Sequence, residues 1–193
     1  NESYFKNSII QGIPNEGYTK IFKRLVENKR IKIIYNSNFK YENNHNIKYL
    51  TIYTGPLDKL LNNKFGKLDW RSLEFRKKIV NTEDFQGTSV MNFPELKYRF
   101  TRIHEPRHLH VERNYGKKTL IIKEFPTINN NEPYYPINDD LNRARHKKYK
   151  DFLNKNNKKI IFGGRLADYA YYDMDMTISA ALKKFDQLKK NFK

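Results

Sequence analysis

The stretch that decides the fold is Ile160-Ile161-Phe162-Gly163-Gly164-Arg165-Leu166. A short apolar, β-branched run that ends in paired glycines is typical of a strand running into a tight turn. Residues 175–188 then carry apolar side chains at helical spacing, which predicts an amphipathic helix. Strand, turn and helix indicate a βα unit, which completes a parallel sheet only where other parallel strands exist. We find few candidates upstream and expect those strands to belong to sequence outside this chain.

The rest of the chain is dominated by short runs of β-branched and aromatic residues. These runs predict strands over residues 31–35, 49–53, 68–71, 73–76, 88–93, 98–103 and 119–125. Helical spacing or composition predicts helices over residues 18–27 and 141–154. Several strands alternate apolar with polar residues, which favours an antiparallel or mixed sheet with one face on a core. The expected fold class is α+β, an antiparallel or mixed sheet with flanking helices and a C-terminal βα piece.

Composition indicates a folded protein. The 193 residues are 38% hydrophobic and 15% aromatic, more than a disordered chain would carry. The absence of cysteine excludes disulfides and thiolate chemistry and favours a reducing compartment. No apolar run approaches the roughly 20 residues of a membrane-spanning helix, so we expect a soluble, cytoplasmic protein without a membrane partner. Because residue 1 is Asn, we also expect a fragment or a processed chain.

The net charge of +17 would attract nucleic acid, anionic lipid or a phosphorylated small molecule. Much of the excess is Lys beside Asn, as in residues 154–159, which a biased genome would produce without functional demand. One alternative stays open on this evidence. A basic face with stacking aromatics could make the chain a catalytically inactive module that binds nucleotides or single-stranded nucleic acid.

Two sets of residues suggest an anion site. Gly163 and Gly164 would let the backbone approach a ligand closely, and a helix N-terminus stabilises phosphate. The simpler interpretation is a tight turn with Asp173 or Asp175 as the helix N-cap, and for this motif alone it is favoured. The second set offers a guanidinium fork, an amide and phenol hydroxyls, as a diphosphate site requires. Its members are Asn92, Arg102, Tyr135 and Tyr171. Here the alternative is packed turn tyrosines and an arginine paired with a surface acid.

The sequence also contains a group of potential metal ligands: His104, Glu105, His108, His110 and Glu112. Pro106 breaks the local regularity, and short histidine clusters usually belong to a polar surface, so we expect no metal. The sequence contains no phosphate loop GxxxxGK[ST], no nucleophile elbow GxSxG and no dinucleotide fingerprint GxGxxG.

The order of several weak motifs resembles the C-terminal half of the UDP-galactopyranose mutase family. The matching segments are Tyr4-Phe5, Gln11-Gly12-Ile13-Pro14, Tyr53-Thr54-Gly55-Pro56-Leu57-Asp58, Phe65-Gly66-Lys67-Leu68, Arg71-Ser72-Leu73, Thr101-Arg102-Ile103-His104-Glu105 and Phe162-Gly163-Gly164-Arg165-Leu166. The resemblance implies a sheet domain over residues 1–156 and, over residues 157–193, a βα segment of a Rossmann-like FAD-binding domain. The glycine loop of that domain and a helical domain would be absent from this chain.

The resemblance implies an FAD-dependent isomerase that interconverts UDP-galactopyranose and UDP-galactofuranose through an adduct between the sugar and N5 of the reduced flavin. Such an enzyme serves galactofuranose biosynthesis and cell surface polysaccharides. The partners implied are UDP-galactose and the missing N-terminal half, in cis or in trans. A homodimer stays open, and nucleic acid is not expected. The isolated fragment is expected to be inactive.

The resemblance also assigns residues. Those implied for catalysis are Arg102, Tyr135 and Tyr171. Those implied for substrate binding are Tyr4, Asn92, Arg102, Tyr135 and Tyr171. Those implied for the cofactor are Arg71, Gly164, Arg165, Asp173 and Met174. One departure is Ala167-Asp168, where the family usually has Gly-Thr; a carboxylate beside a cofactor phosphate is unfavourable unless it points to solvent.

Overall fold

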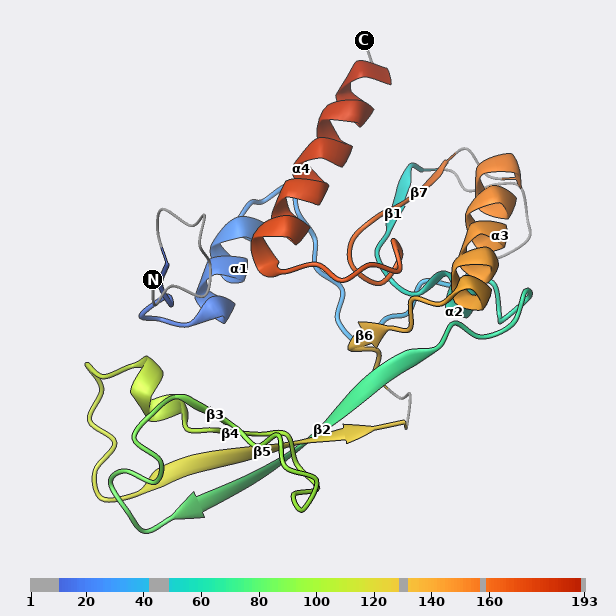
Figure 1. Cartoon of the computed structure of the whole chain (residues 1–193). Coiled ribbons are helices and arrows are strands. Elements are labelled where there is room, and N and C mark those ends of the chain that lie inside the picture. Colours follow the sequence, from blue (N-terminus) through green and yellow to red (C-terminus); the bar gives the residue numbers. More distant parts are fainter. Residues whose placement is uncertain (1–10, 42–48, 129–131, 157–158, 192–193) are drawn as a thin grey trace. The chain divides into compact units, whose positions relative to one another are not determined.

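The computed structural model describes residues 11–41, 49–128, 132–156 and 159–191. Its helices are α1 (Tyr18–Val26), α2 (Leu57–Leu60), the 3-10 turn η1 (Pro106–Leu109), α3 (Asp140–Asn156) and α4 (Met174–Asn191) (Figure 1). Its strands are β1 (Thr51–Tyr53), β2 (Trp70–Val80), β3 (Val90–Asn92), β4 (Arg102–His104), β5 (Thr119–Thr127), β6 (Tyr135–Pro136) and β7 (Ile160–Phe162). None of these helices is long and apolar enough to cross a membrane.

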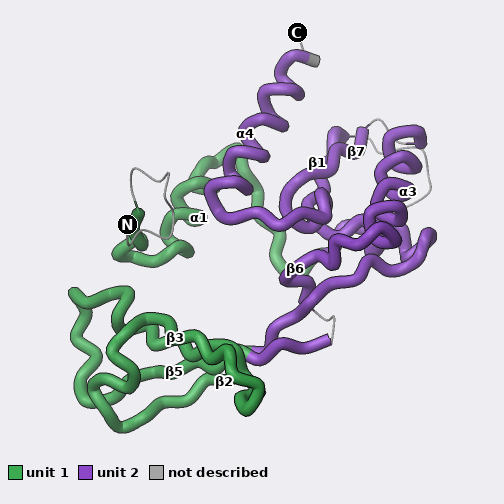
Figure 2. The backbone as a smooth tube through the Cα atoms, in the orientation of Figure 1, with its two compact units in different colours: residues 1–37, 75–124 green, residues 38–74, 125–193 purple. Residues whose placement is uncertain are grey.

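The chain divides into two compact units, each built from two separate segments (Figure 2). Unit 1 comprises residues 1–37 and 75–124, and unit 2 comprises residues 38–74 and 125–193. Strands β2 and β5 each contribute residues to both units. The predicted domain boundary between residues 156 and 157 stays a prediction.

Unit 2 contains a parallel pair of strands with a helix-covered core. Strand β7 pairs with β1, placing Thr51 opposite Ile160 and Tyr53 opposite Phe162. One parallel partner of β7 therefore lies within this chain, and the expectation that further strands lie outside it stays a prediction. Within the described residues this parallel sheet has two strands, and its membership of a Rossmann-like domain stays a prediction.

Helix α3 covers that core through Tyr149 and Leu153, which lie one turn apart and are fully buried. The Tyr149 hydroxyl donates to the carbonyl of Gly66 at 2.8 Å and accepts from the amide of Phe65 at 3.0 Å. The other buried members of the cluster are Leu57, Leu60, Leu61, Leu68, Trp70, Phe162, Ala167 and Tyr169. The hydroxyl of Tyr149 thus fixes a loop 83 residues away against the helix.

The turn after β7 is held by Tyr169, which adopts a left-handed φ of 51°. Its ring packs edge-on against Trp70 with centroids 4.8 Å apart. Its hydroxyl donates to the carbonyl of Asp69 at 2.5 Å and accepts from the amide of Ile137 at 3.1 Å. Burial raises the pKa of Tyr169 to about 12, so the phenol remains a neutral donor.

The second sheet has five strands in the order β3-β4-β5-β2-β6. Its pairs β3–β4, β4–β5 and β2–β6 are antiparallel. Ile103 on β4 and Ile121 on β5 are buried, whereas β3 is exposed throughout. The mixture of antiparallel and parallel sheets with flanking helices agrees with the expected α+β class.

Most predicted elements are confirmed within a few residues, including α1, α3, α4, β1, β3, β5 and β7. Residues 31–35 form no strand; Ile34 and Tyr35 are exposed, and strand propensity is realised only where a neighbouring strand offers pairing. The two strands predicted near residue 70 are one, β2. Strand β4 begins only at Arg102, because Phe100 and Tyr98 pack around Phe93 instead. The short elements α2, η1 and β6 were not predicted.

Candidate functional site

The predicted site residues fall into two sets, one in each unit. In unit 1, Arg102 opens β4 and Asn92 ends β3, and the two are cross-strand partners. Arg102 Nε donates to Asn92 Oδ1 at 3.0 Å. The Arg102 side chain is 46% exposed, so a large part of the guanidinium can meet an anion from solvent.

A buried carboxylate lies beneath this pair. Glu124 is opposite Arg102 in the β4–β5 register, and its Oε2 lies 3.9 Å from Arg102 Nη1. The same oxygen lies 3.1 Å from His104 Nε2, and Oε1 accepts from the Thr101 hydroxyl at 3.2 Å. The acid paired with Arg102 is thus a buried strand residue rather than a surface one. Because Arg102 Nη1 and Glu124 Oε2 are 3.9 Å apart, the carboxylate neutralises the guanidinium only in part.

In unit 2, two tyrosine rings and one guanidinium form a compact group. Tyr135 of β6 and Tyr171 stack with centroids 5.6 Å apart and an interplanar angle of 21°. The Arg165 guanidinium carbon lies 5.5 Å from the first centroid and 5.7 Å from the second, within cation–π range. Arg165 also donates to the carbonyl of Tyr134. These contacts fix the arginine against two aromatic faces.

Strand pairing brings a second arginine into the same unit. Arg71 of β2 is the register partner of Tyr135, and its carbonyl accepts from the Tyr134 amide at 3.2 Å. Arg71 is exposed. Both arginines therefore bond to the main chain of Tyr134 within unit 2. Arg71 does so through its carbonyl, and Arg165 through its guanidinium.

The glycine turn carries its own anion. Gly164 has a φ of 86°, and its amide donates to Asp168 Oδ2 at 3.1 Å. The Tyr172 hydroxyl donates to the same oxygen at 3.3 Å; burial first, and then the Asp168 charge, raises the pKa of Tyr172. The sequence does not predict where the Asp168 carboxylate points. In the structure it accepts a hydrogen bond from the Gly164 amide. The Gly164 amide is consequently already bonded.

The remaining predicted residues lie apart from these contacts. Asp173 precedes α4, where its carbonyl accepts from the Thr177 amide at 2.9 Å, and Met174 begins the helix with 64% of its surface exposed. Within the described residues, neither side chain has a hydrogen bond or ring contact with the Tyr135–Tyr171 group. Tyr4 lies outside the described residues. Sequence reasoning missed Glu124, whose signal was an acidic residue inside the apolar run 119–125.

Each set combines an arginine with amide or phenol groups, a combination that can bind phosphorylated ligands. A model of the UDP-galactopyranose mutase family matches residues 1–171. The chain belongs to the UDP-galactopyranose mutase family.

Individual relatives agree with this assignment. The chain is 38% identical to UDP-galactopyranose mutase of Mycoplasma genitalium, over 96% of this chain and 49% of that protein. It is 34% identical to a probable UDP-galactopyranose mutase of Klebsiella pneumoniae, over 96% of this chain and 48% of the relative. It is 30% identical to dTDP-fucopyranose mutase of Escherichia coli, over 94% of this chain and 49% of the relative. The chain spans about half the length of the curated relatives it matches.

Proposed function

We propose that the chain supplies the C-terminal part of an FAD-dependent isomerase that interconverts UDP-galactopyranose and UDP-galactofuranose. The observation that carries this proposal is the exposed Arg102 guanidinium, oriented by Asn92 at 3.0 Å in a member of the mutase family. The remaining half of the enzyme would be the partner, in the same chain or as a separate protein. A cytoplasmic location and a product destined for cell surface polysaccharide belong to the same proposal.

The names of the relatives support recognition of a nucleoside diphosphate. The Mycoplasma genitalium and Klebsiella pneumoniae proteins are named for UDP-galactopyranose, and the Escherichia coli relative for dTDP-fucopyranose. Base and sugar differ between these names, whereas the nucleoside diphosphate attached to a pyranose is common to both. We therefore assign Arg102 to the diphosphate, and we favour UDP-galactose because the family model and most of these relatives carry that name.

Arg102 would act on the leaving group. When the bond between the anomeric carbon and the diphosphate oxygen breaks, negative charge grows on that oxygen. A guanidinium already held in place by Asn92 stabilises this charge without reorganising. The weak pairing with Glu124 at 3.9 Å leaves most of the positive charge for the ligand. Asn92 would add a neutral donor beside Arg102. Tyr4, Tyr135 and Tyr171 are proposed as substrate-binding residues, and Tyr135 and Tyr171 also as catalytic ones.

The flavin would lie against the unit 2 residues. Arg71 and Arg165 fit an anionic group of FAD by charge, and Asp173 and Met174 are assigned to the same cofactor. The Gly164 amide does not fit a phosphate while it bonds to Asp168, so Gly164 is assigned only a close backbone approach. When bound, the reduced flavin would supply the nucleophilic nitrogen for the anomeric carbon.

The first experiment is a calorimetric titration of this chain with UDP. We expect binding that Arg102→Ala weakens at least tenfold and that Arg99→Ala, an exposed arginine three residues earlier, leaves unchanged. A parallel anaerobic assay with FAD, dithionite and UDP-galactofuranose follows formation of the pyranose form. Equal UDP affinity in the wild type and Arg102→Ala would refute the role of Arg102. Turnover by this chain alone would show that no partner half is required.

A further inference from the structure

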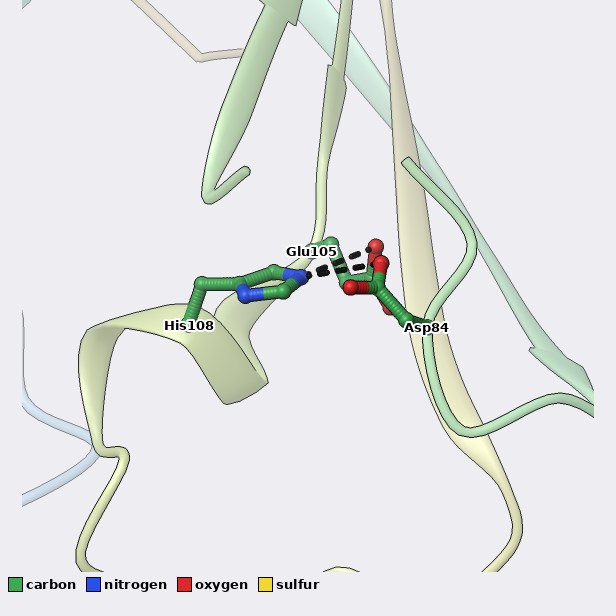
Figure 3. A group of neighbouring side chains, drawn as sticks. All are labelled: Asp84, Glu105 and His108. Atoms are coloured by element: carbon green, nitrogen blue, oxygen red, sulfur yellow. Dashed lines mark ion pairs between the residues drawn. The ribbon is translucent and has the colours of Figure 1, made fainter. Parts of the chain in front are cut away.

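Three potential metal ligands converge in unit 1, and none of them belongs to the two sets described above (Figure 3). Asp84 lies in the loop after β2, Glu105 precedes η1, and His108 lies within η1. One ligand atom from each lies within 4.8 Å of the other two. Only two of these residues belong to the histidine-rich group weighed from the sequence, since Asp84 comes from a different loop.

The spacing of the atoms suits a small transition-metal ion. His108 Nε2 lies 3.3 Å from Asp84 Oδ1 and 3.4 Å from Glu105 Oε2. Zinc binds nitrogen and oxygen ligands at about 2.0–2.2 Å with tetrahedral geometry, which places neighbouring ligand atoms about 3.4 Å apart. The two separations from the histidine nitrogen match this edge length, and the two carboxylates lie within 4.8 Å of each other.

The carboxylates are oriented by main-chain donors, as metal ligands usually are. Glu105 is fully buried, and its oxygens accept from the amides of Phe85 at 3.1 Å and Gln86 at 2.9 Å. Asp84 Oδ1 accepts from the Gly87 amide at 2.6 Å. These bonds hold both acids in place and favour their ionised forms, which metal binding requires.

The pKa values agree with that geometry. The Gly87 amide is the largest influence lowering the pKa of Asp84. Burial raises the pKa of Glu105, but hydrogen bonds from the Thr119 hydroxyl and the Phe85 and Gln86 amides outweigh it, and the net direction is downward. Both acids are therefore carboxylates at neutral pH.

The histidine nitrogen lies between the two carboxylates, where a metal ion bound by all three residues would have to lie. Nε2 of His108 is inaccessible to solvent, and it has no hydrogen-bond partner of good geometry among the described residues. It nevertheless faces two carboxylate oxygens at 3.3 and 3.4 Å (Figure 3). A metal ion bound at this nitrogen would replace two long ion-pair contacts with short coordination bonds.

We propose that Asp84, Glu105 and His108 bind a divalent zinc-class ion, which joins the loop after β2 to η1. Three protein ligands leave one coordination position for water or a further ligand. Asp84, whose side chain is 54% exposed, provides access from solvent. This proposal revises the expectation of no metal drawn from the sequence, and it is independent of the proposed isomerase function.

The test is equilibrium dialysis of the metal-stripped chain against Zn²⁺, with Co²⁺ absorption as a second readout of tetrahedral geometry. We expect one Zn²⁺ per chain and at least tenfold weaker binding in His108→Gln and in Asp84→Asn, since each removes a ligand. Asn at position 84 can still accept from Gly87, so this variant retains the loop geometry. His110→Gln is the matched control, because His110 pairs with Glu112 instead.

The outcomes are distinct. Loss of binding in both ligand variants but not in His110→Gln, with unchanged circular dichroism, supports the site. Absence of stoichiometric Zn²⁺ at 10-fold excess, or equal binding by His108→Gln, overturns it and identifies an ion-pair cluster only. Loss in His110→Gln alone would place a zinc site on His110 and Glu112 and would equally overturn the assignment.

Discussion

The carboxylate of Asp168 accepts a hydrogen bond from the amide of Gly164, four residues earlier, at 3.1 Å. The reverse bond, from the Asp168 amide to the Gly164 carbonyl at 2.9 Å, closes the same turn. The glycine turn is therefore complete without any ligand, and its internal anion occupies the amide that an external phosphate would need.

Removal of that carboxylate should loosen the turn. We expect Asp168→Ala to lower the free energy of unfolding by about 1–3 kcal/mol, because it leaves the Gly164 amide unpaired and removes an ionised acceptor. Asp168→Asn retains an acceptor and should lose less. Urea unfolding measures both variants, and an Asn variant that loses as much as the Ala variant would contradict this account.

The positive φ of Gly164 predicts a contrast between two adjacent glycines. Gly164→Ala would hold an L-residue at φ 86° and should cost about 1–2 kcal/mol, although its new Cβ would lie 3.8 Å from the nearest atom. Gly163→Ala needs no positive φ, and its Cβ would make an ordinary contact of 3.6 Å with Lys184 Cε. Urea midpoints compare the two variants. Equal losses would show that space, rather than backbone conformation, limits this turn.

Removal of the Tyr149 hydroxyl oxygen alone tests how much its two hydrogen bonds stabilise the core of unit 2. Tyr149→Phe would leave the Phe65 amide and the Gly66 carbonyl without their partner, at a cost of about 1–3 kcal/mol. Tyr171→Phe is the control, since that side chain is 56% exposed. Thermal unfolding of both variants makes the comparison. A destabilised Tyr171→Phe beside an unchanged Tyr149→Phe would be incompatible with the described core.

His146 predicts how stability depends on pH. Burial lowers the pKa of His146 below its ordinary 6.5, and its Nε2 lies 2.8 Å from the carbonyl of Ala167. The unfolded chain therefore binds a proton more readily, so this histidine contributes stability above pH 6.5 that is lost as the pH falls through the folded-state pKa. Unfolding free energies measured from pH 7.5 down to pH 5.5 should fall in the wild type. His146→Gln should flatten this slope, whereas His110→Gln should retain it.

Local patterns were sufficient for α1, α3 and α4 and for β1 and β7, because apolar spacing and paired glycines determine them within a few residues. They failed at Ile34 and Tyr35, whose strand propensity has no partner strand to satisfy it. Residue type groups Asn92 with Arg102 in one candidate anion site but does not predict their contact, which the structure shows across two strands. Asp84 beside His108 could not be predicted, because the hydrogen bonds to backbone amides that bring the two together depend on the folded loop.

The pairing of β1 with β7 has a consequence for synthesis of the protein. Thr51 meets Ile160 across roughly a hundred residues, a separation that slows formation of the pair. During translation β1 therefore leaves the ribosome long before β7 is synthesised. Until then the unpaired edge of β1 can associate with other nascent chains. Slower translation at low temperature, or a chaperone that shields Thr51–Tyr53, should accordingly increase the yield of folded protein.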